Sequence, residues 1–258
     1  MGPPPNLRLN LRLLRQHLLR ILRHAGIILV SARNPRVRYF DHPPASAFED
    51  VLLRTFPDLQ GLNFIQIGAN DGRRADPLRA FIDDYAWTGL MFEPLRANFA
   101  DLQRHRGATP RLRLRRAAID VTAGRRLVYD LEPGAASVPD WAHGLGSFSR
   151  ERVEQAARDL GLLSTAIRAE EVETITWAQV WREFGPHCCD LLVLDTESYD
   201  MTLLRVADLA QHRPRVILFE HACNTLDERI AFYRELFELG YDLATCGGDT
   251  VASLPPDR

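Results

Sequence analysis

Residues 64–72, FIQIGANDG, join a run of apolar side chains to a turn that contains two glycines. The run predicts a buried strand over residues 62–68, and a helix is expected soon afterwards, over 76–85. Gly68 would let the backbone approach a ligand closely, and Gly72 would permit a turn conformation that bulkier residues avoid. The spacing is G-x-x-x-G, not G-x-G-x-x-G, so the stretch does not predict a dinucleotide pyrophosphate site.

Strand-like and helix-like segments alternate in the rest of the chain from Ser46 onward. Strands are predicted over 88–93, 112–120, 172–176, 190–195 and 216–221, and helices over 95–106, 177–184, 199–209 and 227–239. Gly240 is expected to end the last helix in the left-handed conformation, and residues 241–245 and 250–254 to form a closing hairpin. This alternation predicts an α/β fold with a doubly wound, mostly parallel sheet that helices cover on both faces.

Length and composition indicate one large globular domain with an appendage. The chain has 258 residues and a formal net charge of -2, which gives no reason to expect a nucleic-acid partner. The cysteines do not form a C-x-x-C pair, and we expect free thiols in a reducing cytoplasm. We also expect no secretory signal, because the apolar segment over 26–32 is short and its basic leader is too long. The predicted location is therefore the cytoplasm.

The predicted domain boundary separates an N-terminal arm and linker, residues 1–45, from a catalytic domain over residues 46–258. Leucines and arginines interleave over residues 6–24, which predicts a basic amphipathic helix. One interpretation is a peripheral contact with a membrane surface or a dimer contact. The other, which we favour, is that the helix simply packs on the domain, because further leucines interrupt its polar face.

Glu93 ends the second predicted strand, 21 residues after Gly72. A carboxylate at that edge of a doubly wound sheet can accept hydrogen bonds from both ribose hydroxyls of an adenosine ligand, as the acidic residue does in dinucleotide folds. The alternative is a solvated charge at a strand end. Together, the glycine turn and Glu93 favour nucleoside binding.

Six stretches of the chain, in order, resemble the FkbM family of S-adenosylmethionine-dependent methyltransferases: FIQIGANDG (64–72), GLMFEPLRANFADL (89–102), AAIDVTAG (117–124), ETITWAQVW (173–181), DLLVLDTESYDMTLLR (190–205) and ILFEHA (217–222). The resemblance implies a class I, Rossmann-like methyltransferase fold whose seven-stranded sheet ends in an antiparallel hairpin. It also implies S-adenosylmethionine as the cofactor.

The resemblance further implies the cofactor-binding residues. The turn Gly68, Ala69, Asn70, Asp71 and Gly72 would surround the methionine end, Glu93 would hold the ribose, and Ala118 and Ile119 would flank the adenine. Gln66 and Pro94 are also counted among the cofactor-binding residues. Two positions depart from the family pattern. Gln66 stands where the family often has an acid, and Ser198 replaces the usual glycine of a D-x-E-G element. Gln66 could alter one hydrogen bond to the cofactor, and Ser198 could alter the local backbone conformation.

The candidate catalytic residues are Asp195, Glu197, Glu220 and His221, which end two predicted strands. If the strands are neighbours, these groups converge beside the methyl donor. Methyl transfer to oxygen requires an aligned acceptor whose proton is removed, and histidine is well suited to that task near neutral pH. His221 is therefore the first choice as general base and Glu220 the second. The same acids could hold Mg²⁺, but no metal site is favoured.

The predicted function is O-methylation of a hydroxyl on a sugar or natural-product small molecule, a substrate class that rests on the family resemblance alone. One alternative is a non-catalytic module that uses the fold for binding or membrane-associated assembly. A less favoured alternative is a nucleotide-dependent oxidoreductase, which the missing G-x-G-x-x-G and the terminal hairpin disfavour. The non-periodic segment between Leu131 and Phe148 is predicted to be a substrate lid.

Overall fold

The computed structural model describes residues 46–131, 144–162 and 167–255. The predicted N-terminal arm, residues 1–45, and most of the predicted lid lie outside the described residues. Within the described part of the chain, no helix is long and apolar enough to cross a membrane.

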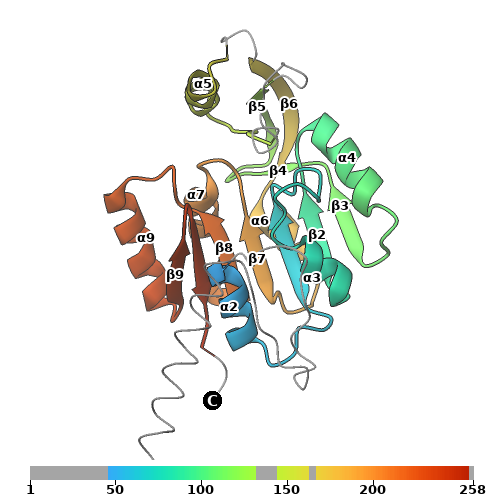
Figure 1. The fold of residues 1–258 in the computed structure, drawn as a ribbon, viewed down its shortest axis with the longest axis vertical. Helices are drawn as coiled ribbons and strands as arrows, with labels where there is room; N and C mark the ends of the chain where they lie inside the picture. Colours follow the sequence, from blue (N-terminus) through green and yellow to red (C-terminus); the bar gives the residue numbers. More distant parts are fainter. Residues whose placement is uncertain (1–45, 132–143, 163–166, 256–258) are drawn as a thin grey trace, which may run out of the picture.

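The main sheet has seven strands in the order β3-β2-β1-β7-β8-β10-β9 (Figure 1). The bounds are β1 Asn63–Ile67, β2 Thr88–Phe92, β3 Leu112–Arg115, β7 Leu191–Leu194, β8 Val216–Glu220, β9 Asp242–Cys246 and β10 Asp249–Ser253. Strands β3, β2, β1, β7 and β8 are parallel, and β10 runs antiparallel to both of its neighbours. The predicted doubly wound sheet with a terminal antiparallel hairpin is thus confirmed. Chain order reverses between β1 and β7, which is where ligands bind in such sheets.

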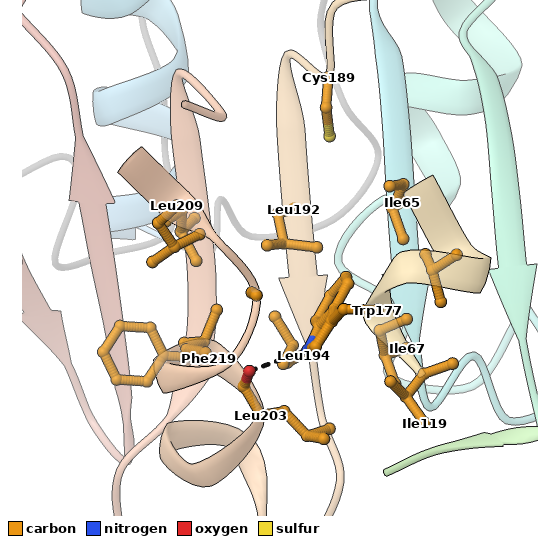
Figure 2. Packing of buried hydrophobic residues seen from close by; sticks show 14 of the residues in the cluster. Ile65, Ile67, Ile119, Trp177, Cys189, Leu192, Leu194, Leu203, Leu209 and Phe219 are labelled. Atoms are coloured by element: carbon orange, nitrogen blue, oxygen red, sulfur yellow. Dashed lines mark hydrogen bonds between the residues drawn. The ribbon is translucent and has the colours of Figure 1, made fainter. Parts of the chain in front are cut away.

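Helices cover both faces of this sheet, because its central strands are apolar on both sides. One core packs α2 Ser46–Thr55, α3 Arg79–Asp84 and α4 Arg96–Arg106 against the sheet. The opposite core holds α6 Trp177–Phe184, α7 Asp200–Arg205, α8 Leu209–His212 and α9 Leu226–Glu238. Figure 2 shows this second core, in which the Trp177 indole N–H donates to the Leu203 carbonyl oxygen at 2.8 Å. That bond ties α6 to α7 beneath the carboxyl ends of the strands.

A second, smaller sheet was not predicted. It consists of β4 Ala118–Ile119, β6 Ile167–Ile175 and β5 Gly124–Leu131, in that order, and carries α5 Arg150–Asp159. In Figure 1 β5, β6 and α5 stand above one end of the main sheet, and we call residues 124–131, 144–162 and 167–172 the cap. The predicted strand 112–120 is wrong as one element, because Ala118 and Ile119 leave the main sheet and pair with β6. The strand predicted over 172–176 likewise belongs to the smaller sheet.

Helix ends differ from prediction where a side chain or dihedral angle interrupts the helix. The helix expected over 199–209 is two helices, because Asp208 adopts a left-handed φ of 51°. The helix expected from residue 76 begins at Arg79, since the Asp76 carboxylate accepts the Leu78 backbone N–H at 2.9 Å and closes a turn instead. The left-handed end of the last helix is confirmed, with φ of 89° at Gly240.

Candidate functional site

A cavity of about 460 Å³ opens at the carboxyl ends of β1, β2 and β7. Eight residues predicted to bind cofactor line it: Gln66, Gly68, Ala69, Asn70, Glu93, Pro94, Ala118 and Ile119. Asp71 and Gly72 do not line it; they shape the turn behind it. Of the candidate catalytic residues, Asp195 and Glu197 line the cavity, whereas Glu220 and His221 do not.

The glycine turn brings two strands together. Gly68 has φ of 81°, and a Cβ there would overlap the carbonyl oxygen of Asp195 at the end of β7. The backbone at Gly68 therefore lies close to the end of β7. The sequence predicts a close approach at this glycine, but to a ligand. Asp71, which is buried, accepts the backbone N–H groups of Arg73 and Arg74 at 2.9 and 2.8 Å and so closes the turn.

The side-chain nitrogen of Gln66 is hydrogen-bonded, whereas its side-chain oxygen is not bonded to any described residue. Its side-chain nitrogen donates to Asp76 Oδ1 at 3.1 Å, which fixes the orientation of the amide. Gln66 Oε1 is buried and has no hydrogen-bond partner among the described residues. Where the family pattern has an acid, this chain therefore places an amide that is itself paired with a buried acid.

Glu93 is buried at the end of β2 and lines the cavity. Its carboxylate accepts the backbone N–H of Asn70 at 3.0 Å and that of Leu95 at 2.9 Å, so it ties the glycine turn to the start of α4. Burial raises the pKa of Glu93 to about 8, although the two N–H donors oppose that rise. Glu93 is thus an acceptor whose charge depends on pH near neutrality.

The predicted adenine end of the cavity has a wall from the cap as well. Ala118 and Ile119, which are predicted to flank the adenine, line the cavity together with Val128 of β5 and Phe148. Sequence reasoning missed Phe148, because it follows a segment without periodicity that gives no indication of where its side chains point.

Asp195 and Glu197 follow β7 and line the cavity. The side chain of Asp195 has exposed surface, but this surface faces the cavity and protein surrounds it, so burial and the neighbouring Glu197 raise its pKa well above the ordinary value. Among the described residues it has no hydrogen-bond partner. Glu197 forms an ion pair with Arg152 of α5 at 3.1 Å, and burial raises its pKa to about 7.

Glu220 is the last residue of β8 and His221 follows it; neither lines the cavity, although the charge of Glu220 helps to raise the pKa of both Asp195 and Glu197. Burial raises the pKa of Glu220, and Arg152 opposes the rise. His221 is buried, with its Nδ1 2.9 Å from the Thr250 hydroxyl oxygen, and burial lowers its pKa. The predicted convergence therefore holds for Asp195 and Glu197 but not for His221. A position at a strand end specifies the edge of the sheet, not the side to which the residue points.

Asp200 is a second residue that sequence reasoning missed. It is buried, and its carboxylate accepts the Thr196 backbone N–H at 2.8 Å, the Thr196 hydroxyl, and the Glu220 backbone N–H at 2.8 Å. It thereby ties the loop after β7 to the end of β8. The sequence feature that could have indicated its role is its position, as an acid in the first turn of the helix that follows the D-x-E element.

The loop after β7 is strained at the position where the family has glycine. Ser198 has φ of 86°, and Glu197 before it has φ of 51°. A left-handed non-glycine residue costs about 1–3 kcal/mol. The serine thus keeps the backbone conformation that the usual glycine would adopt, at a cost in stability.

Replacing Ser198 by glycine is expected to stabilise the protein by about 1 kcal/mol. The relief of strain exceeds the roughly 0.5–1 kcal/mol that glycine costs through its freedom in the unfolded chain. The melting temperature should rise by about 2–4 °C, measured by calorimetry. The control is Ser198→Ala, which keeps the Cβ and should not stabilise; equal gains from both substitutions would exclude backbone strain as the cause.

Carboxylates gather at this site, but their arrangement differs from that of a metal centre. Among the described residues, no group of three or more His, Cys, Asp or Glu side chains is placed to hold a metal ion.

Comparison with solved structures returns methyltransferases at low identity. The structure of methyltransferase FkbM from Methylobacillus flagellatus matches with 13% identity and a TM-score of 0.49, over 82% of this chain and 48% of that one. The present chain thus spans about half the length of that protein. A human methyltransferase 10 domain containing protein matches with 10% identity and a TM-score of 0.43, over 95% and 97% of the two chains. A SAM-dependent methyltransferase from Thiobacillus denitrificans, in complex with S-adenosyl-L-homocysteine, matches with 13% identity and a TM-score of 0.36, over 82% and 68%.

Comparison with curated protein sequences gave no significant match. The model of the methyltransferase FkbM domain matches residues 66–243, which run from the strand before the glycine turn to the closing hairpin. That span includes the predicted cofactor residues and both carboxylates of the cavity. The strand order of the main sheet is that of class I methyltransferases, in agreement with this match. The chain therefore belongs to the FkbM methyltransferase domain family.

Proposed function

We propose that this chain binds S-adenosylmethionine in the cavity at the carboxyl edge and methylates a hydroxyl of a small molecule, such as a sugar or a natural product. The observation that carries the proposal is the arrangement of the cavity. Glu93 follows β2, the glycine turn that begins at Gly68 follows β1, and Asp195 with Glu197 follow β7, and these three strands are neighbours in the sheet.

The chemistry of the cavity fits the cofactor. A carboxylate can accept about four hydrogen bonds. Glu93 takes two from backbone N–H groups and one from the Asn98 side chain, which leaves acceptor capacity for a ribose hydroxyl. The apolar walls around Ala118 and Ile119 suit a purine. When bound, the cofactor supplies an electrophilic sulfonium methyl group.

Residues of this chain would align the acceptor and receive its proton. Asp195 offers the cavity a carboxyl group that has no hydrogen-bond partner in the described part of the chain, and an acceptor hydroxyl can bond to it. Glu197 has a pKa of about 7, so near neutral pH it can both take and release a proton. As the acceptor oxygen bonds to the methyl carbon and the carbon–sulfur bond breaks, its proton would pass to Glu197. The products would be a methyl ether and the neutral thioether.

Two measurements test the proposed function against its alternatives. Calorimetry should show binding of S-adenosylhomocysteine and no binding of NAD; the reverse would support an oxidoreductase. Mass spectrometry of sugars and polyhydroxylated natural products incubated with enzyme and S-adenosylmethionine should show addition of one methyl group. Cofactor binding without methylation across such a panel, together with N-methylation of amines, would contradict the choice of a hydroxyl.

The N-terminal arm is proposed to take no part in cofactor binding or in the chemical step. A chain that begins at Ser46, the first residue of α2, should keep the affinity of the full chain for S-adenosylhomocysteine. The buried Phe48 and Leu52 that anchor α2 are retained in this variant. If the shortened protein folds but its affinity drops, the arm belongs to the cofactor site.

A further inference from the structure

Phe148 lines the cavity from the cap, next to the wall that holds Glu93. A Cβ on Gly144 would overlap the Asn70 side-chain amide, and one on Gly146 would lie 2.9 Å from Leu95 Cδ1. Residues 144–148 therefore run closely along the glycine turn and the end of β2. The half-buried Phe148 ring packs against a small core of Leu95, Ala118, Val128 and Val172.

The orientation of the Phe148 ring is fixed by two neighbours. The Arg126 guanidinium carbon lies 4.0 Å from its centroid, within cation–π distance. The Tyr199 ring meets it edge-on, with centroids 5.3 Å apart and an interplanar angle of 88°. Asp120 anchors both neighbours, because it accepts Arg126 Nη1 at 2.9 Å and the Tyr199 hydroxyl at 2.8 Å. The ring is thus preorganised before any ligand enters.

We propose that Phe148 is an adenine-stacking residue of this enzyme, placed by the cap in the lining of the cavity beside Ala118, and that Arg126 is its positioning residue. A phenyl ring whose orientation is fixed at the wall of a cavity presents a π-face to a planar base, and such stacking tolerates little loss of geometry. The ligand class is a purine nucleoside whose ribose reaches Glu93. This inference rests on the proposed function, since it places the same cofactor.

The first test measures affinity for S-adenosylhomocysteine by calorimetry in variants of Phe148. Phe148→Ala should weaken binding by about 5- to 150-fold, the range that loss of one base–aromatic stack produces. Phe148→Tyr should bind as the wild type does, and Phe148→Leu, which keeps an apolar side chain without a π-face, should fall between them. In Phe148→Trp, added ligand should quench fluorescence beyond the quenching of the wild type.

The second test separates positioning from a general loss of charge. Arg126→Met should weaken the affinity for S-adenosylhomocysteine by about two- to fivefold, which corresponds to the loss of a cation–π contact of about 0.5–1 kcal/mol. Arg126→Lys should restore much of that affinity, because lysine keeps the positive charge. The matched control is Arg125→Met on the same strand, whose exposed side chain pairs with Glu171 at 2.8 Å on the surface. It should leave affinity unchanged.

The outcomes distinguish this inference from the proposed function. Wild-type protein that does not bind S-adenosylhomocysteine would overturn the proposed function itself. Wild-type binding with unchanged affinity in Phe148→Ala would overturn the assignment of Phe148 alone. Where Phe148→Ala fails to fold, by circular dichroism, Phe148→Leu decides: binding equal to the wild type would show that apolar packing, not stacking, is all that Phe148 contributes.

Discussion

Replacing Glu93 by alanine is expected to weaken S-adenosylhomocysteine binding by about 10- to 150-fold. The substitution removes the acceptor of charge-assisted hydrogen bonds from the ribose hydroxyls, which are worth about 1.5–3 kcal/mol. Isothermal calorimetry on folded protein at about pH 9, where Glu93 is mostly ionised, measures the effect. Glu93→Gln separates charge from side-chain length, because its amide oxygen can still accept one of the two backbone N–H groups but carries no charge. Unchanged affinity in Glu93→Ala would contradict the assignment.

The same residue predicts a pH dependence for cofactor binding. Burial raises the pKa of Glu93 to about 8, so below that value the group is mostly protonated and is a poorer acceptor for ribose. Affinity for S-adenosylhomocysteine should therefore rise as pH increases through about 8. In Glu93→Gln this rise should disappear. A wild-type affinity that stays flat from pH 6 to pH 9 would show that the carboxylate charge does not contribute.

The main sheet could be predicted because its strands are short continuous apolar runs at regular intervals. The smaller sheet could not, because burial does not define its strands. Only Val172, Thr174 and Ile175 of the nine residues of β6 are buried. The charged half of β6 is held by pairing with β5, to which Arg125 and Glu171 add a cross-strand ion pair. Such pairing is a tertiary contact that hydrophobic periodicity does not report.

The candidate site likewise contains some residues that the sequence could place and others that it could not. Glu93 and the turn from Gly68 follow apolar strands directly, so sequence position alone placed them at the correct edge. Phe148 and Arg152 come from the cap, and packing of the cap brings them to that edge. No local pattern near either residue indicates this contact.

The choice between Glu197 and His221 also needed the structure. Both follow strands that end at the same edge, and histidine has the more suitable ordinary pKa. Burial shifts the two values in opposite directions, raising that of Glu197 to about 7 and lowering that of His221. Geometry adds to this, because Glu197 lines the cavity while His221 bonds to Thr250 behind it.

Replacing Glu197 by glutamine is expected to lower the methyl-transfer rate by about 10²- to 10⁴-fold, the contribution typical of a general base. Affinity for S-adenosylhomocysteine should change little, because the base contacts the acceptor. His221→Ala tests the interpretation from sequence in parallel, and it should keep a turnover close to that of the wild type. The rates are to be measured in single turnovers with and without EDTA, since a metal mechanism predicts loss of activity on chelation and its return with Mg²⁺.

The pH profile of turnover distinguishes a base from a residue that only orders the loop. A base works when deprotonated, so the wild-type rate should rise with pH and level off above about 7, the pKa of Glu197. The Arg152 guanidinium, 3.1 Å from Glu197, lowers that pKa, so Arg152→Met should move the rise to higher pH, whereas Arg152→Lys should largely preserve it. Residual activity of Glu197→Gln should lose this rise. If instead Glu197→Gln turns over at the wild-type rate and His221→Ala loses 10²-fold or more, the proton passes to His221, and the cavity must rearrange to admit it.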